Sequence, residues 1–228
     1  MARIVQSNLD FLSNLEKNNN REWFDNHKDL YLKERKNIIS FADDLLLKMN
    51  SHDNIENESG KKCLHRIYRD VRFSKNKLPY KNNWPISFIR ATNLLRGSYY
   101  VHIQHNASFV GVGFWGPSPE DLKRIRMQFT MFGNEFNDIL ADKKFINTFG
   151  EMQGSQLKIG PKGFDKNDQY INLLKYKQFL ISKTFTDKEV LSKDFSEKII
   201  NVFKVARPFL NFFSEALTTD INGETIFK

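Results

Sequence analysis

Four short β-rich segments follow one another closely in this chain, and their spacing limits what it can fold into. The segments are residues 62–73, 84–90, 98–104 and 107–114. Only 2–10 residues, rich in Lys, Asn, Pro and Gly, separate each from the next. A parallel pair needs a crossover of about a dozen residues or more, so these connections favour antiparallel pairing. We expect a tight hairpin at His105 and Asn106.

Helical patterns flank these segments on both sides. From Asn20 to Met49, apolar residues recur at three- and four-residue spacing, which predicts one long amphipathic helix. Ser118 followed by Pro119 is a helix start, and residues 178–185 fit a further strand. We therefore expect an α+β fold in which an antiparallel β-sheet of about 4–6 strands is packed by N-terminal and C-terminal helices.

No repeat and no linker divides the chain, which indicates a single domain over residues 1–228. Residues 1–50 form its helical N-terminal part, and residues 61–115 form the sheet. Residues 118–228 are expected to be mainly helical, with one or two short strands.

Composition excludes several classes of protein. With 40% hydrophobic residues, 11 Gly and 6 Pro, the chain is neither disordered nor collagen-like. Cys63 is its one cysteine, so an intrachain disulfide and a multi-thiolate metal site are impossible. No apolar run reaches the ~18 residues of a membrane span. We expect a cytoplasmic protein that uses no membrane, metal or cofactor; its oligomeric state is open.

Positive charge is concentrated in one part of the chain. Residues 61–100 hold ten basic and one acidic side chain, a balance of +9. The balance is −3 for residues 1–60 and +2 for residues 101–228. A solvated surface normally mixes both signs, so this excess indicates an anionic partner, either a ligand or an internal acid.

The densest part of this basic segment is the run from Arg66 to Lys81. If residues 64–73 are extended, their polar face carries Arg66, Tyr68, Asp70 and Arg72. Guanidinium groups match carboxylate and phosphate with paired donors, and a neighbouring carboxylate can orient them. The predicted ligand-binding residues are Arg66, Tyr68, Arg69, Asp70, Arg72, Lys75, Lys77, Tyr80, Lys81 and His102. If the site is catalytic, Asp70 and His27 are the candidates for proton transfer.

The same run resembles a bacterial family, domain of unknown function family 2461. Its pattern is Arg-x-x-Arg-Asp-x-Arg-Phe followed by Ser-Lys-Asp-Lys-x-Pro-Tyr-Lys, which residues 66–81 match except that Asn76 replaces the usual Asp. The likeness extends over residues 18–31, 97–103, 109–126 and 161–165. The resemblance implies a cytoplasmic single-domain protein of about this length, and it implies no activity.

Three interpretations of the basic run stay open. It can bind an anionic small molecule that bears phosphate or carboxylate, which is the leading hypothesis. It can bind nucleic acid, since Tyr68, Phe73 and Tyr80 interleave with the cations. Finally, the arginines can be purely structural and pair with Asp70, Glu22 or Asp25.

Overall fold

A computed structural model describes residues 2–220 and 222–227. Its helices, in chain order, are α1 (Gln6–Lys17), α2 (Arg21–Asn26), α3 (Lys28–Asn50), α4 (Gly60–Cys63), α5 (Pro119–Ala141), α6 (Lys143–Phe149), α7 (Ile171–Leu174), α8 (Asp187–Val190) and α9 (Phe195–Thr218). Within the described part of the chain, no helix has the length and apolar character needed to cross a membrane.

One antiparallel sheet contains the strands β1 (Trp84–Ile89), β2 (Ser98–Ile103), β3 (Ser108–Phe114) and β4 (Phe179–Phe185), in the order β1-β2-β3-β4. Consecutive strands are therefore neighbours, as the short connections predicted. The α+β class and the strand at 178–185 are confirmed. At the β2–β3 turn, Asn106 has a φ of 57°, a left-handed conformation that asparagine tolerates better than most residues.

The prediction of a strand over residues 62–73 is wrong. Residues 60–63 form α4, and the residues after them carry only isolated bridges, from Leu64 to Ile86 of β1 and from Tyr68 to Tyr80. Polar and apolar side chains alternate along this segment as they do in a strand, but both faces of its far end are exposed to solvent. Phe73, at the end of this segment, is 97% exposed. With no layer to cover either face there, the extended pairing stops early.

The single long helix expected from Asn20 to Met49 is two helices, so that prediction is also wrong. Asn20 caps α2 by accepting a hydrogen bond from the backbone N–H of Trp23 at 2.9 Å. His27 then leaves the helical conformation, with φ −116° and ψ 20°, and ends α2 just before α3 begins. Both helices are amphipathic, with Phe24 of α2 and residues such as Ile38 and Phe41 of α3 buried, so the apolar spacing alone does not reveal the break.

The helix start predicted at Ser118 is confirmed, and a similar motif begins α8. Ser118 accepts a hydrogen bond from the N–H of Asp121 at 3.1 Å, at the beginning of α5. Thr186 and Glu189 form a reciprocal capping box on α8. Such local pairs satisfy the free N–H groups of a first helical turn, which is why short motifs predict them well.

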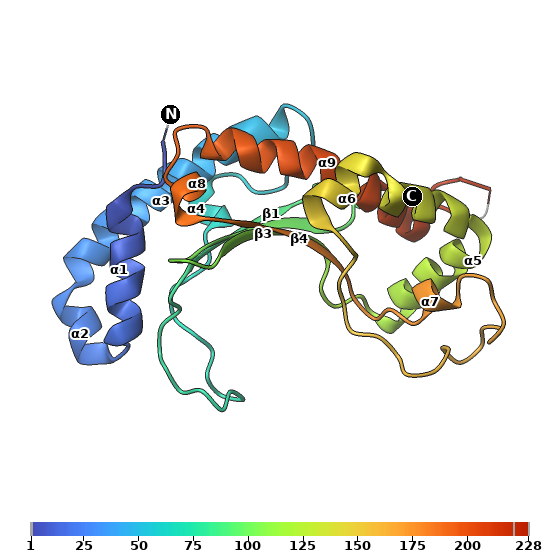
Figure 1. The fold of residues 1–228 in the computed structure, drawn as a ribbon, viewed down its shortest axis with the longest axis horizontal. Coiled ribbons are helices and arrows are strands. Elements are labelled where there is room, and N and C mark those ends of the chain that lie inside the picture. The colour runs from blue at the N-terminus through green and yellow to red at the C-terminus, as the bar shows by residue number, and fades with distance from the viewer. Residues whose placement is uncertain (1, 221, 228) are drawn as a thin grey trace. The chain divides into compact units, whose positions relative to one another are not determined.

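The chain forms two compact units, each of which is assembled from three segments. The first contains Met1–Ile89, Tyr100–Val110 and Thr184–Asn201. Its core includes buried residues of α1 and α3 spaced three or four apart: Leu9, Leu12, Leu15, Ile38, Phe41, Leu45 and Met49. Figure 1 shows residues 64–83 of this unit as a long irregular loop that leaves the sheet before β1.

The second unit contains Arg90–Tyr99, Gly111–Lys183 and Val202–Lys228, and its core is built largely from phenylalanine. Phe213 lies at the centre, with ring centroids 4.9 Å from those of both Phe179 and Phe209. Phe129 and Phe136 pack against the same residue. Tilted and edge-on aromatic pairs of this kind add specific geometry to the burial of apolar surface.

A glycine sets the approach of two strands in the second unit. Gly113 has a φ of 134°, and a Cβ there would lie 2.0 Å from the carbonyl oxygen of Phe179 on β4. Gly113 thus allows β4 to approach β3 closely. Gly116 is three residues away and has open space around its missing side chain.

We predict that Gly113→Ala destabilises the protein by roughly 2–6 kcal/mol, which adds the strain of a left-handed alanine to a backbone clash. Gly116→Ala is the matched control and should stay within about 0.5 kcal/mol of wild type. Urea unfolding followed by circular dichroism measures both. Equal midpoints for the two variants would contradict this account of the β3–β4 contact.

Candidate functional site

The basic run lies on a long irregular hairpin, residues 64–83, which we call the basic hairpin. The bridge Tyr68↔Tyr80 joins its two limbs, and the bridge Leu64↔Ile86 connects its first residue to β1. Around the bridge between the limbs, the N–H of Arg69 donates to the carbonyl of Pro79 at 2.9 Å. The limbs are therefore paired near the sheet, and the segment beyond them is a loop.

Tyr80 anchors the basic hairpin to α2 and to the turn before it. Its ring is buried and stacks on that of Phe24, with centroids 4.1 Å apart and planes 16° from parallel. The backbone of Tyr80 faces away from the opposite limb, and the Asn19 side chain pairs with it. Asn19 donates to its carbonyl at 2.9 Å and accepts from its N–H at 3.1 Å. One amide side chain thus satisfies both groups.

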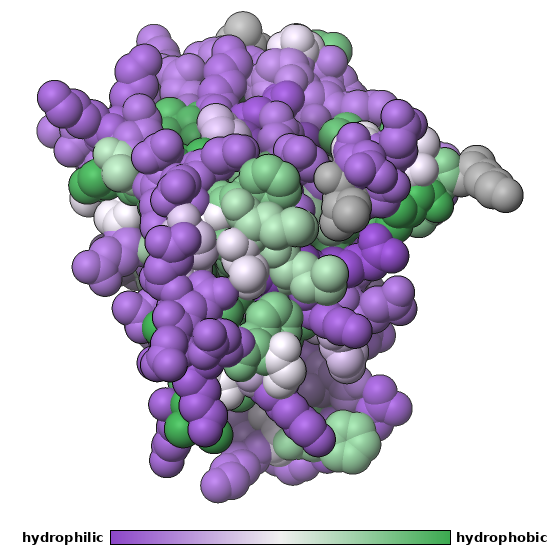
Figure 2. Space-filling model, turned by 90° about the vertical axis from the view of Figure 1, so that its right-hand side faces the viewer, coloured by the Kyte–Doolittle hydropathy of each residue, from purple (hydrophilic) through white to green (hydrophobic). Residues whose placement is uncertain are grey.

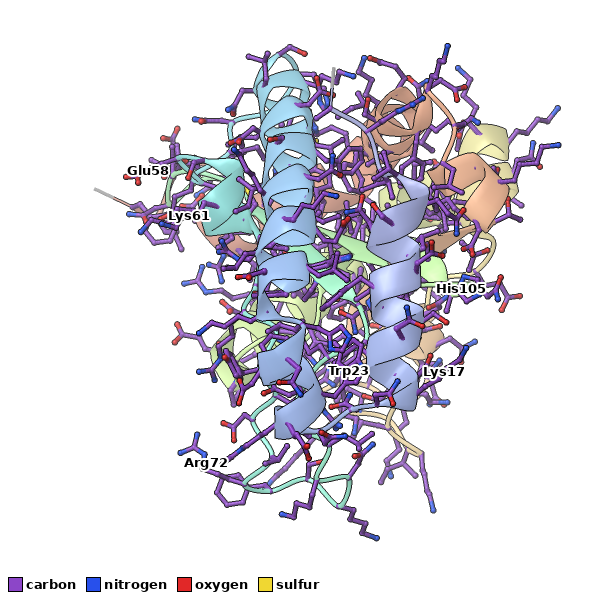
Figure 3. All side chains as sticks on the ribbon, turned by 90° about the vertical axis from the view of Figure 1, so that its left-hand side faces the viewer. Lys17, Trp23, Glu58, Lys61, Arg72 and His105 are labelled. Atoms are coloured by element: carbon purple, nitrogen blue, oxygen red, sulfur yellow. The ribbon has the colours of Figure 1, made fainter. Side chains whose placement is uncertain are left out.

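Beyond the paired part of its limbs, the hairpin is held by local bonds and is exposed. The Asp70 carboxylate accepts hydrogen bonds from the Arg72 guanidinium at 2.6 and 3.0 Å, and Arg72 holds the pKa of this carboxyl below its usual value. Lys77 donates to the carbonyl of Val71 at 2.9 Å. Figure 3 shows Arg72 at one extremity of the view, far from Lys61 of α4.

An open pocket of about 400 Å³ lies where the limbs meet the sheet. Its lining comes from both limbs, from β1 and from β2: His65, Arg69, Asp70, Lys81, Asn83, Pro85 and Tyr100. All of these residues belong to the first unit. Arg69 and Asp70 both contribute, although strict alternation would point them to opposite faces, because the limb is not a regular strand.

The pocket disfavours additional positive charge. The Lys81 ammonium donates to the carbonyl of Arg66, and burial together with the nearby Arg66 charge lowers the pKa of Lys81. Burial and the Lys81 charge lower the pKa of His65, whose Nε2 lies 2.7 Å from the hydroxyl of Ser87. A bound anion would relieve both effects, since it favours the protonated forms.

A polar chain continues from the pocket along β2. The hydroxyl of Tyr100 lies 3.0 Å from Nδ1 of His102, and Nε2 of His102 lies 2.7 Å from Oε1 of Gln104. Burial raises the pKa of Tyr100 to about 12 and lowers that of His102, so both groups are neutral near pH 7. The ring of Phe109 stacks on His102 with centroids 4.6 Å apart.

The structure brings together only some of the residues predicted for ligand binding. Arg69, Asp70 and Lys81 line the pocket, and His102 stands behind Tyr100. The remaining predicted residues lie on the hairpin and are not part of the lining: Arg66, Tyr68, Arg72, Lys75, Lys77 and Tyr80. The arginines were expected on a face of the sheet, and that expectation is wrong because their segment is not a strand.

His27, a candidate for proton transfer, is not among the residues that line the pocket. Its Nδ1 lies 2.7 Å from the carbonyl oxygen of Trp23, and its ring stacks on the Trp23 ring with centroids 4.0 Å apart. It serves the junction of α2 and α3. Glu22 and Asp25 were considered as partners of the arginines, but no ion pair joins them to Arg69 or Arg72 in the described part of the chain.

Sequence reasoning missed four residues that build or line this site. Nothing local in the sequence reveals that Asn19 pairs with Tyr80, 61 positions along the chain. His65 and Asn83 flank the basic run without belonging to its pattern. Tyr100 could have been found, because it is two residues from His102 on a strand and must share its face.

A second depression, of about 410 Å³, lies in the second unit between α5 and the residues that follow α9. Exposed Met127 and Met131 contribute to it, beside charges of both signs such as Arg124 and Asp220. Figure 2 shows apolar side chains gathered among hydrophilic ones on the face that carries the second unit. Among the residues that the structure describes, no cluster of three or more His, Cys, Asp or Glu could hold a metal ion.

Comparison with known proteins defines the family. A family model described as "Conserved hypothetical protein (DUF2461)" matches residues 7–212. The chain therefore belongs to this family, as the resemblance of the basic run indicated. Neither a curated protein nor a solved structure matches the chain.

We predict that Asn19→Ala loosens the basic hairpin and lowers the free energy of unfolding by about 1–3 kcal/mol, since two half-buried backbone groups lose their partners. Asn18→Ala removes one exposed bond to the carbonyl of Asn14 and is the control. Hydrogen exchange at the Tyr80 amide should be faster in Asn19→Ala than in Asn18→Ala. Unchanged protection of the Tyr80 amide in Asn19→Ala would show that the Asn19 side chain is not needed to hold the hairpin.

Proposed function

We propose that the pocket at the base of the basic hairpin binds a phosphate- or carboxylate-bearing small molecule. The single observation that carries the proposal is that Arg69 and Lys81 line an open pocket without an acidic partner. Neither forms an ion pair with a carboxylate within residues 2–220 and 222–227. Unpaired cations in a partly buried site are costly unless a ligand balances them.

Both cations have donors to offer. Arg69 gives one N–H to the carbonyl of Leu78 at 3.2 Å, which leaves four of its five donors. Lys81 gives one of three to Arg66. Asp70, the acid in the lining, is already engaged by the Arg72 guanidinium. The pocket therefore keeps a net attraction for an anion.

A structural role for part of the motif is compatible with this proposal. Arg72, Lys77 and Tyr80 stabilise the shape of the hairpin, whereas Arg69 and Lys81 face the pocket. The cytoplasmic setting is also part of the proposal. Cys63 fits it, since the thiol is buried and its pKa is raised to about 12 by burial and by Asp43, which keeps it protonated and unreactive.

We predict that Arg69→Ala and Lys81→Met each weaken the binding of inorganic phosphate by about 10- to 100-fold, the loss of a charge-assisted hydrogen bond. Lys61→Met removes an exposed lysine outside the pocket and should leave binding unchanged. Isothermal titration calorimetry at fixed ionic strength measures the affinities. Equal affinities in all three variants would overturn the proposal.

One observation favours nucleic-acid binding as a second candidate function. Phe73 is almost fully exposed at the end of the hairpin, beside exposed Arg72, Lys75 and Lys77. A short single-stranded oligonucleotide is therefore included as a titrant. Oligonucleotide binding that Phe73→Ala abolishes and Lys81→Met preserves would support this candidate against the pocket.

We further predict that phosphate raises the pKa of His65. Burial and the Lys81 charge lower it in the free protein, and a bound anion stabilises the imidazolium. NMR titration of the His65 ring between pH 4 and 8, with and without phosphate, measures the shift. The ring signals of His105, which is paired with Asp187, should not respond to phosphate. A downward shift or none at His65 would place the anion elsewhere.

A further inference from the structure

The hydrogen-bond chain on β2 fixes the direction of the Tyr100 hydroxyl. Oε1 of Gln104 can only accept, so Nε2 of His102 carries the hydrogen in their 2.7 Å contact. The imidazole is neutral, because burial disfavours its charged form. Its Nδ1 is therefore an acceptor, and the Tyr100 hydroxyl donates to it over 3.0 Å.

Neighbouring side chains hold the hydrogen-bonded series from Tyr100 to Gln104 in place. Phe109 stacks on the His102 ring at 19° from parallel. The backbone of Gln104 is tied to the Ser108 hydroxyl at both its N–H and its carbonyl, at 3.0 and 2.8 Å. Rotation of the phenol hydrogen toward the pocket would leave Nδ1 of His102 without a donor, which is costly in a partly buried site.

Tyr100 consequently contributes an acceptor to the pocket. Its hydrogen is committed to His102, and its oxygen forms no second hydrogen bond within the residues that the structure describes. Asp70 adds carboxylate oxygens to the same lining. The pocket thus combines the donors of Arg69 and Lys81 with acceptors, an arrangement that a fully deprotonated anion cannot satisfy.

We propose that the pocket selects oxyanions that carry their own hydroxyl hydrogen, such as inorganic phosphate, over fully ionised oxyanions such as sulfate. The inference rests on the proposed function of this pocket and names its ligand class. The P–OH group would donate to Tyr100 while the charged oxygens accept from Arg69 and Lys81. Sulfate has the same shape but no hydrogen at pH 7, so an acceptor would face an acceptor.

The expected discrimination is moderate because the pocket is open to water, which can solvate an acceptor that the ligand leaves unpaired. We expect wild type to bind phosphate about tenfold more tightly than sulfate. Tyr100 is then a specificity residue, and His102 is a positioning residue that acts through it.

Calorimetry with sodium phosphate and sodium sulfate, at pH 7 and equal ionic strength, tests the proposal. Tyr100→Phe should weaken phosphate binding, leave sulfate binding unchanged and bring the affinity ratio toward one. His102→Phe keeps an aromatic ring against Phe109 but removes the acceptor, which frees the Tyr100 hydrogen. It should therefore strengthen sulfate binding, an effect that a merely damaged fold would not produce.

Tyr176→Phe is the matched control. It also loses a hydroxyl that donates a hydrogen bond, here to the carbonyl of Met152 at 3.2 Å, but it lies in the second unit. Its affinity ratio should equal that of wild type. Circular dichroism confirms that each variant is folded.

The outcomes separate this inference from the proposed function. If wild type binds both anions equally and Arg69→Ala loses both, the selection of a hydroxyl hydrogen is wrong and the anion pocket stands. An unchanged ratio in Tyr100→Phe overturns the role of Tyr100. If wild type binds neither anion, both proposals fail.

Discussion

The candidate site depends on how one tyrosine is held. Tyr80 lies on the second limb of the basic hairpin, and its buried ring stacks on Phe24 while Asn19 pairs with its backbone. The next residue is Lys81, so this anchor also positions a cation in the pocket. The hairpin has few regular ladder bonds of its own, and these contacts replace the sheet neighbour that it lacks. A rigid attachment close to the cations is what a binding site requires.

The electrostatics of the pocket favour negative charge over positive charge. In the purely structural alternative, acids would neutralise the guanidinium groups and the cationic forms would be favoured. Instead, burial lowers the pKa values of Lys81 and His65, and in each case a neighbouring cation lowers the pKa further. Asp70 lines the pocket, but its carboxylate is paired with Arg72, which does not, and water screens this exposed pair. Arg69 and Lys81 are thus the lining cations that have no carboxylate partner among the described residues.

Local patterns predicted the fold where the determinants are local. Ser118 and Thr186 start helices through bonds to residues three positions away, and β1, β2 and β3 follow from short connections. The same reasoning wrongly predicted a strand at residues 64–73, since alternation of polar and apolar side chains indicates a strand only where a second layer covers one face. The role of Asn19 could not be predicted from local patterns, because its partner Tyr80 is 61 positions away. The charge excess located the hairpin, but which cations face the pocket is decided by that long-range contact.

Asn76 shows that some residues of the basic hairpin serve its turn, whereas others line the pocket. The pattern that the basic run resembles has an aspartate at this position, so this chain carries one negative charge fewer there. Oδ1 of Asn76 accepts the N–H of Leu78 at 2.9 Å, and an aspartate oxygen could accept the same bond. Position 76 is also not part of the pocket lining. The two residues can therefore serve the same turn, and anion binding at Arg69 and Lys81 does not require a carboxylate there.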